Sequence, residues 1–366
     1  MTDKSPLFEA CAEVGADFAE EGGWLVAGRY ADVAQEYLQA RQHAAIFDLS
    51  SRGKIELTGP DTASFLHNLS TNAILHLPSG RGCEAFFATL KAKIIAHAYI
   101  FRASSPGGGD SYWIDVAPAA ADKLLKHLNH FLISEQVEIS DRTRELAQIY
   151  VAGPDALTVL RQLMGKDLAD LADLEQRPIS LATAEASQLR RQDLFNVPGY
   201  TILCPGQQAE AVWRALNQAG GHPAGAEAFN VLRIEAGLPA DGVDFDENCL
   251  IMEIGRTSQA ISYTKGCYLG QEPVVRSRDL GHVNRTLLGV KIRARSALKP
   301  GTKLWRDGKE VGHLTSSAWS PRLQSVIGLA YIRRGNQDPG TLLQLDHDSE
   351  KTTAEVASLP FALSMN

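Results

Sequence analysis

The pattern of apolar and polar residues predicts the same strand–turn–helix unit at two places in the chain. Residues 54–58 alternate between apolar and polar side chains, Gly-Pro-Asp follows at 59–61, and apolar residues then recur at helical spacing over 62–69. Residues 147–165 repeat this pattern around a second Gly-Pro-Asp at 153–155. One copy is explained equally well as a good turn between a strand and a helix, but two copies in the same context favour an internal duplication.

The remaining apolar pattern predicts further helices and strands up to residue 286 and strands alone beyond it. In the first part, the pattern predicts helices at 31–46, 117–132, 208–221 and 226–239. It predicts strands at 93–102, 111–117 and 199–205. From Leu287 onwards, short strand-like runs are separated by turn residues, and Asp307-Gly308 has the composition of a tight hairpin turn. Such spacing predicts a small antiparallel barrel.

These patterns together predict an α+β fold. We expect residues 1–286 to form two related α+β units, near 1–140 and 141–286, and residues 287–366 to form the C-terminal β-barrel. The length of 366 residues is typical of two or three domains, and a hydrophobic content of 44% is enough for a packed core.

Charge and cysteine usage narrow the class of protein. The formal net charge of −7 argues against DNA or RNA as the main partner, because proteins that bind phosphate backbones usually carry a basic surplus. The acidic N-terminal residues lack the order of a secretory signal, and no apolar run is long enough to span a membrane. The five cysteines are far apart and form no CxxC motif, which predicts free thiols in a cytoplasmic setting. Because no apolar run is long enough to span a membrane, no membrane partner is expected.

Three segments together resemble the folate-dependent glycine cleavage T-protein superfamily. They are FDLSSRGKIELTGPDTASFLHNLSTN at 47–72, LRIEAGLPADGVDFDEN at 232–248 and KGCYLGQEPVVRSRDLGHVNR at 265–285. The last is similar to the signature of the YgfZ branch, whose members bind folate and are associated with iron–sulfur cluster maintenance. The resemblance implies two ferredoxin-like units in a ring, a C-terminal barrel and a site for tetrahydrofolate or a one-carbon derivative.

The resemblance also locates possible catalytic residues. T-proteins use an aspartate on the strand that matches residues 93–102, and His97 stands in its place, with Ala92 where the family often has glycine. Glu84 and Thr201 depart from the family at two further positions, an aromatic residue and a glutamate respectively. A neutral imidazole carries no fixed negative charge but can act as a general base, so we expect little aminomethyl transfer. The alternative for His97 is a half-buried strand histidine.

Four residues are candidate folate contacts. Arg233 matches an arginine that the family places near folate, and a guanidinium can hold a carboxylate with two hydrogen bonds. An interdomain ion pair, with Glu235 or an upstream acid, is an equally good explanation of Arg233. The aromatic residues Trp113, Phe101 and Tyr200 could flank a pterin ring, although aromatic residues on strands are more often part of the core.

The signature segment makes Cys267 the strongest candidate for a functional thiol. Lys265 and Arg276 could stabilise a thiolate, and Gln271 and Glu272 add polar groups that an apolar filler would not need. Because a cluster normally takes four protein ligands, one cysteine could serve only as a redox thiol or as one ligand of a site shared with a partner. The alternative is a small buried hydrophobe.

No metal site is predicted. His127 and His130 lie three residues apart on a predicted helix, but no third ligand is apparent.

Three functions remain. The first is a tetrahydrofolate-binding YgfZ-like protein that supports iron–sulfur enzymes or assembly proteins. The others are a folate-dependent one-carbon transferase of the aminomethyltransferase type, and an interaction scaffold with a decayed folate site.

Overall fold

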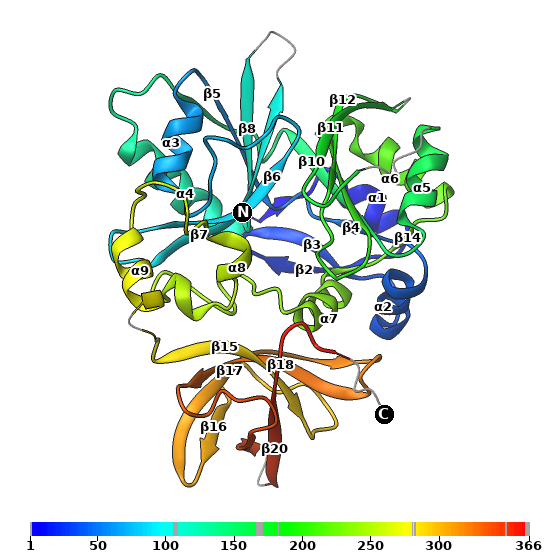
Figure 1. The fold of residues 1–366 in the computed structure, drawn as a ribbon. Coiled ribbons are helices and arrows are strands. Elements are labelled where there is room, and N and C mark those ends of the chain that lie inside the picture. Colours follow the sequence, from blue (N-terminus) through cyan, green and yellow to red (C-terminus); the bar gives the residue numbers. More distant parts are fainter. Residues whose placement is uncertain are drawn as a thin grey trace. The chain divides into compact units, whose positions relative to one another are not determined.

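The computed structural model shows an α+β protein whose C-terminal strands close into a barrel (Figure 1). It describes residues 2–104, 109–165, 171–181, 183–279, 281, 283–347 and 350–362. The chain forms two compact units, each made of three segments. The first unit comprises Met1–Phe87, Ile95–Phe229 and Gln259–Leu269, and the second comprises Ala88–Ile94, Asn230–Ser258 and Gly270–Asn366.

The first sheet of the first unit has five strands in the order β6-β7-β8-β5-β9. Its elements are β5 (Gly53–Thr58), α3 (Thr62–Leu69), β6 (Gly82–Ala88), β7 (Ile94–Ser104), β8 (Asp110–Val116), α4 (Pro118–Phe131) and β9 (Glu138–Asp141). The pairs β7–β8, β8–β5 and β5–β9 are antiparallel. The expected strands at 93–102 and 111–117 and the helix at 117–132 are therefore confirmed.

The second sheet of this unit has six strands in the order β11-β12-β13-β10-β4-β14. Its elements are β4 (Ala45–Asp48), β10 (Leu146–Ala152), α5 (Ala156–Met164), β11 (Gln176–Leu181), β12 (Ala184–Arg191), β13 (Gly199–Pro205), the 3₁₀ turn Gly206–Gln208, α6 (Ala209–Gln218) and β14 (His222–Pro223). The elements that precede β4 are β1 (Asp3–Lys4), α1 (Phe8–Glu13), β2 (Asp17–Glu21), β3 (Trp24–Arg29) and α2 (Val33–Gln42).

The two sheets repeat one topology, as an internal duplication predicts. The series β5-α3-β6-β7-β8-α4 has the same order as β10-α5-β11-β12-β13-α6, and the strands of each series take equivalent places in their sheets. The two sheets differ beside the first strand of each series. In the first sheet β9, which follows α4 in the chain, pairs with β5, whereas in the second sheet β4, from the N-terminal part of the chain, pairs with β10.

The two Gly-Pro-Asp turns make the same contact in both halves. Gly59 and Gly153 have φ angles of +116° and +133°, and a Cβ added at either would lie 2.1 Å from a backbone carbonyl oxygen. Only glycine fits such a close approach. The helices begin at Thr62 and Ala156, so Pro60 and Pro154 both precede their helices.

The second unit contains the six-stranded closed barrel in the order β15-β18-β17-β16-β19-β20. Its strands are β15 (Arg285–Ile292), β16 (Lys303–Arg306), β17 (Lys309–Ser320), β18 (Ser325–Arg333), β19 (Leu342–His347) and β20 (Glu350–Ala357). Asp307 and Gly308 join β16 to β17 with φ angles of +51° and +73°, which confirms the expected tight hairpin. Aliphatic side chains that include Val290, Leu314 and Ile332 fill the barrel.

The other helical segments are α7 (Ala226–Ala236), the 3₁₀ turn Ile251–Glu253, α8 (Thr257–Ala260) and α9 (Gln271–Asp279). Residues 230–258 group with the barrel in the second unit. The division of the chain at residues 140 and 286 stays a prediction. Across the described residues, every helix is too short or too polar to span a membrane.

Candidate functional site

The first sheet has two buried faces of different chemistry. Its face towards α3 and α4 is apolar and contains Ala85, Ala96, Ala98, Ile100 and Ile114. Because side chains alternate along a strand, the residues between these positions lie on the opposite face, which we call the inner face. Its residues on β6, β7 and β8 are Glu84, Phe86, His97, Tyr99, Phe101, Trp113 and Asp115, all less than a tenth exposed.

The second sheet follows the same rule. Ile149, Val151 and Ile202 lie on its apolar side, in the cluster that also contains residues of α5 and α6. The alternate positions on β10, β12 and β13, which form its own inner face, are Gln148, Tyr150, Arg190, Thr201 and Leu203. Each half therefore buries polar and ionisable groups on the side that its helices do not cover.

The two inner faces meet within the first unit. Asp115 on β8 accepts hydrogen bonds from Arg52 Nε at 2.5 Å and from Gln148 Nε2 on β10 at 2.8 Å. The Arg190 guanidinium lies 4.4 Å from the centre of the Phe101 ring. Buried charges at such a junction need partners, and the inner faces supply them from both halves of the duplication.

Glu84 and His97 form a buried pair across β6 and β7. His97 Nε2 lies 2.7 Å from Glu84 Oε1, and the two side chains are 8% and 4% exposed. The Phe86 and Tyr99 rings lie 4.9 Å and 5.8 Å from the imidazole centre. A carboxylate held against one imidazole nitrogen fixes the orientation of the ring, and the pair can accept a proton without creating a net positive charge.

Lys54 adds a buried cation to the inner face. It alternates with Ile55 on β5, and its Nζ donates to the carbonyl oxygens of Ser50 and Arg52 at 2.8 and 2.7 Å. Burial lowers the pKa of Lys54 to about 8, and the Asp115 carboxylate opposes that shift. Sequence reasoning missed Lys54, because an alternating strand with one polar face is usually taken as half exposed to solvent.

Cys267 lies in an anchored and exposed segment. Of the five cysteines, it is the one that is exposed. Lys265, two residues earlier, donates to the carbonyl oxygens of His67, Ser70 and Asn72, the last two at 2.6 and 2.9 Å. The ammonium thus uses all three N–H bonds on a distant backbone segment. Its hydrogen bonds hold the loop in place, and stabilisation of a Cys267 thiolate by Lys265 stays a prediction.

Burial and the neighbouring aromatic ring also constrain Lys265. Its ammonium lies 4.9 Å from the centre of the buried Tyr268 ring, and burial lowers its pKa to about 8.

The other thiols differ from Cys267 in their surroundings. Burial raises the pKa of Cys11, Cys83 and Cys204 to about 12.

The remaining signature residues lie in the second unit, at the start of α9. Gly270 has a φ angle of +82°, and a Cβ there would lie 2.5 Å from the Thr89 carbonyl oxygen. Gln271 opens α9, and Glu272 pairs with Arg276 one turn later at 2.8 Å, with both side chains exposed. Roles for Gln271 and Glu272 beside the thiol stay predictions.

Arg233, in the second unit, is already neutralised. Its Nη1 lies 2.5 Å from Asp244 Oδ2, and its Nε donates to Asn230 at 2.9 Å. Asp244 also accepts hydrogen bonds from Thr315 and Ser316 on β17. An ion pair therefore forms, but its partner is the downstream Asp244 and not Glu235 or an upstream acid. The role in folate binding that the resemblance implies for Arg233 stays a prediction.

The three candidate aromatic residues divide between two environments. Phe101 and Trp113 lie on the inner face of the first sheet, whereas Tyr200 belongs to the apolar core on the other side of the second sheet. Thr201, the neighbour of Tyr200, does face inwards and donates to Gln192 Oε1 at 2.8 Å. The geometry therefore groups Phe101 and Trp113 with the Glu84–His97 pair and separates Tyr200 from them.

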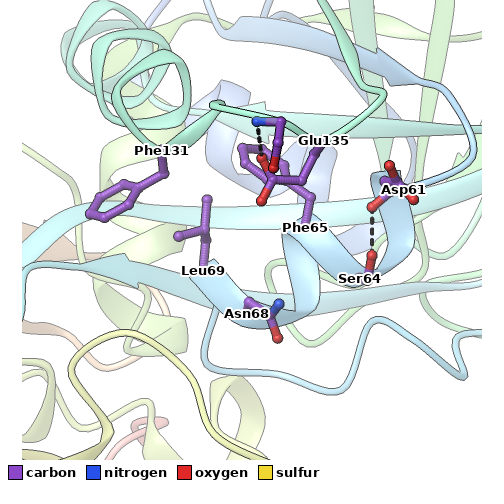
Figure 2. A pocket seen from close by; sticks show the side chains of 8 residues that line it. Asp61, Ser64, Phe65, Asn68, Leu69, Phe131 and Glu135 are labelled. Carbon is purple, nitrogen blue, oxygen red and sulfur yellow. Dashed lines mark hydrogen bonds between the residues drawn. The ribbon is translucent and has the colours of Figure 1, made fainter.

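Two other features lie away from the inner faces. His127 and His130 on α4 both contact the Phe131 ring, and the described residues hold no group of three or more possible metal ligands. A hollow of about 450 Å³ lies between α3 and the end of α4, on the helix-covered side of the first sheet (Figure 2). Its carboxylates, Asp61 and Glu135, already accept hydrogen bonds from nearby backbone N–H groups.

Comparison with known proteins identifies the family. The GCVT N-terminal domain matches residues 7–263, and the glycine cleavage T-protein C-terminal barrel domain matches residues 285–362. The chain belongs to the glycine cleavage T-protein family. An aminomethyltransferase of Geobacillus kaustophilus is 28% identical over 99% of both chains, and one of Rubrobacter xylanophilus is 28% identical over 90% of this chain and 87% of its own.

A solved structure confirms the fold of this T-protein family member. The glycine cleavage system aminomethyltransferase T from Bartonella henselae superposes with a TM-score of 0.90, covering 99% of this chain and 98% of its own at 21% identity. Within this fold, Ala92 has a φ angle of +56°, a left-handed conformation that suits the glycine often found there in the family. Glu84 and His97, which sequence comparison treated as two separate departures from the family, form one pair.

Proposed function

We propose that this protein binds tetrahydrofolate and acts as a folate-dependent one-carbon transferase with Glu84 and His97 as its acid–base pair. The observation that carries the proposal is the buried pair itself. The family resemblance puts the T-protein aspartate at the position of His97, and Glu84 supplies a carboxylate 2.7 Å away. The names of the relatives, which are aminomethyltransferases, favour this function over the alternatives.

The pair can replace a single aspartate in two respects. Glu84 retains a negative charge beside the site, which favours a cationic one-carbon donor, and it orients the His97 ring. The imidazole can then accept the proton that a folate nitrogen loses as it bonds to the one-carbon unit, while the carbon–sulfur bond to the lipoyl carrier breaks and ammonia leaves when the methylene bridge forms. Phe86 and Tyr99 beside the imidazole reduce the access of water, which strengthens these electrostatic interactions.

The test is a transfer assay with an aminomethylated lipoyl carrier and tetrahydrofolate, in which methylene-tetrahydrofolate is measured. Because Glu84 supplies the negative charge that His97 alone lacks, we expect turnover by the wild type, contrary to the expectation from the sequence. We expect a loss of about 100-fold or more in either Glu84→Gln or His97→Gln. The double variant should be no worse than the single variants, because the two groups act as a unit. His130→Gln, on the surface of α4, is the control. Full activity in His97→Gln, or none in a wild type that binds folate, would refute the transferase proposal.

A second function has its own supporting observation, the exposed thiol of Cys267 in a loop anchored by Lys265. In this alternative the protein resembles the YgfZ branch, binds tetrahydrofolate and supports iron–sulfur enzymes through Cys267. Complementation of a deletion strain separates the two functions. Loss of iron–sulfur enzyme activity with Cys267→Ser, but not with His97→Gln, would favour this alternative, and the reverse would favour the transferase.

A further inference from the structure

Arg190 is a buried cation that lacks a carboxylate partner. It lies on β12, is 1% exposed, and forms no ion pair with any residue in the described part of the chain. Its hydrogen bonds go to two neutral amides, from Nε to Gln176 Oε1 at 3.2 Å and from Nη2 to Gln188 Oε1 at 3.1 Å. Buried charges in proteins are normally paired, because taking an ion out of water costs several kcal/mol.

The nearby carboxylate is engaged elsewhere. Asp115 attracts Arg190 from beyond ion-pairing distance, but its own oxygens accept hydrogen bonds from Arg52 and Gln148. Asp115 also attracts the buried ammonium of Lys54. Asp48 and Asp141 also attract Lys54, so the shortfall of negative charge concerns Arg190, which among the described residues has only Asp115, and that at a distance.

The immediate surroundings of Arg190 suit a flat organic anion. Its guanidinium lies 4.4 Å from the centre of the Phe101 ring and 6.0 Å from that of Trp113, so aromatic faces stabilise the cation without neutralising it. The Gln176 amide that accepts from Arg190 has a buried Nε2 with no hydrogen-bond partner in the structure. Gln188, at the Nη2 edge, is half-buried, so this edge is the one nearest to solvent.

Two other arginines of the structure already have a carboxylate partner, unlike Arg190. Arg233 is neutralised by Asp244, and Arg52 by Asp115. A planar guanidinium with a free edge can take a carboxylate through two parallel hydrogen bonds, and the unpartnered Gln176 amide can add a third. We propose that Arg190 and Gln176 form an anion-binding subsite that holds a carboxylate of the ligand. We assign this carboxylate to the glutamate tail of tetrahydrofolate, an assignment that rests on the proposed function.

Calorimetric titration with two ligands tests the subsite. Tetrahydrofolate carries the glutamate tail, and tetrahydropteroate lacks it. The wild type should bind tetrahydrofolate about 10- to 150-fold more tightly than tetrahydropteroate, the value of a charged hydrogen-bonded contact. Arg190→Met should bind both ligands with the affinity that the wild type has for tetrahydropteroate. Arg190→Lys, which keeps the charge but loses the planar fork, should fall between the two.

Two controls keep the outcomes distinct. Arg177→Gln removes a partly exposed arginine of the same sheet, which pairs with Glu175, and should behave like the wild type. Thermal unfolding of Arg190→Met should be unchanged or shifted upwards, because the variant removes a buried unpaired charge. A large fall in the unfolding temperature would show that the guanidinium serves packing, and would overturn the subsite.

Each result of the titration decides one proposal. Equal affinity of the wild type for both ligands, unchanged in Arg190→Met, would overturn the subsite and leave folate binding intact. Failure of the wild type to bind either ligand would overturn the proposed function. In that case p-aminobenzoylglutamate is the probe. Saturable binding that Arg190→Met abolishes would support the subsite as a site for another carboxylate ligand, and absence of binding would overturn it.

Discussion

Replacing Arg233 by methionine should destabilise the protein without a specific effect on folate. The variant leaves the Asp244 carboxylate, whose side chain is 0% exposed, without its cation. Methionine retains most of the length and apolar volume of the arginine stem, so the perturbation is mainly electrostatic. Removing one partner of a buried ion pair costs about 3–5 kcal/mol, because the other charge stays buried and uncompensated.

The structure also predicts how much of this loss can be recovered. Asp244 keeps three hydrogen bonds in the variant, from the Ala240 N–H and from the hydroxyls of Thr315 and Ser316. The cost should therefore lie at the lower end of that range. In the double variant Arg233→Met/Asp244→Asn no buried charge remains, and we expect it to regain more than half of the lost free energy of unfolding.

Urea unfolding followed by far-UV circular dichroism measures these free energies, and calorimetry of the folded variants measures folate affinity. The reasoning predicts a lower unfolding midpoint for Arg233→Met, recovery in the double variant, and folate affinity close to that of the wild type. An Arg233→Met variant that unfolds within about 1 kcal/mol of the wild type but loses folate binding would refute it. The guanidinium would then serve the ligand, as the family resemblance predicts.

Three further predictions concern other sites. Gly270→Ala should destabilise the protein by about 1–3 kcal/mol in urea unfolding, because its φ is +82° and the new Cβ would lie 2.5 Å from the Thr89 carbonyl oxygen; an unchanged midpoint would contradict this. Burial lowers the pKa of Lys54 from 10.5 to about 8. Between pH 8 and pH 10.5 the unfolded chain therefore binds more protons at Lys54 than the folded chain does. The stability of the wild type relative to Lys54→Met should therefore rise from pH 7 to pH 9.5 in thermal unfolding, and a fall would show that the ammonium is net stabilising. Native Cys267 should react with iodoacetamide faster than Cys204, since Cys267 is exposed and burial raises the pKa of Cys204 to about 12; equal rates, read by mass spectrometry, would contradict the assignment of an accessible thiol.

The duplicated fold and the barrel were predictable because local patterns determine them. Alternation and helical spacing identify the elements, Gly59 and Gly153 mark turns where no side chain fits, and Asp307-Gly308 selects its hairpin. The place of β4 in the second sheet was not predictable, because Ile46 pairs with Val151 across a long sequence separation. No local sequence pattern encodes this pairing of β4 with β10.

The site was only partly predictable, for the same physical reason. Sequence reasoning selected Glu84 and His97 separately, but their contact depends on how β6 lies beside β7 in the sheet. Lys265 was chosen for its charge, yet its hydrogen bonds reach carbonyls almost two hundred positions earlier. Arg190 was missed altogether, since an arginine on an alternating strand is usually exposed, and Arg190 is buried because its face of the second sheet packs against Phe101 and Trp113 of the first.

Calorimetric titration of the purified wild-type protein with tetrahydrofolate tests the central claim most directly, because every role assigned to the inner faces depends on the presence of this ligand. The account predicts saturable binding of one tetrahydrofolate per chain, with an affinity that falls when Arg190 is replaced by methionine and not when the surface residue Arg177 is replaced by glutamine. Absence of saturable heat at ligand concentrations up to the solubility limit, from protein whose fold is intact by circular dichroism, would contradict it.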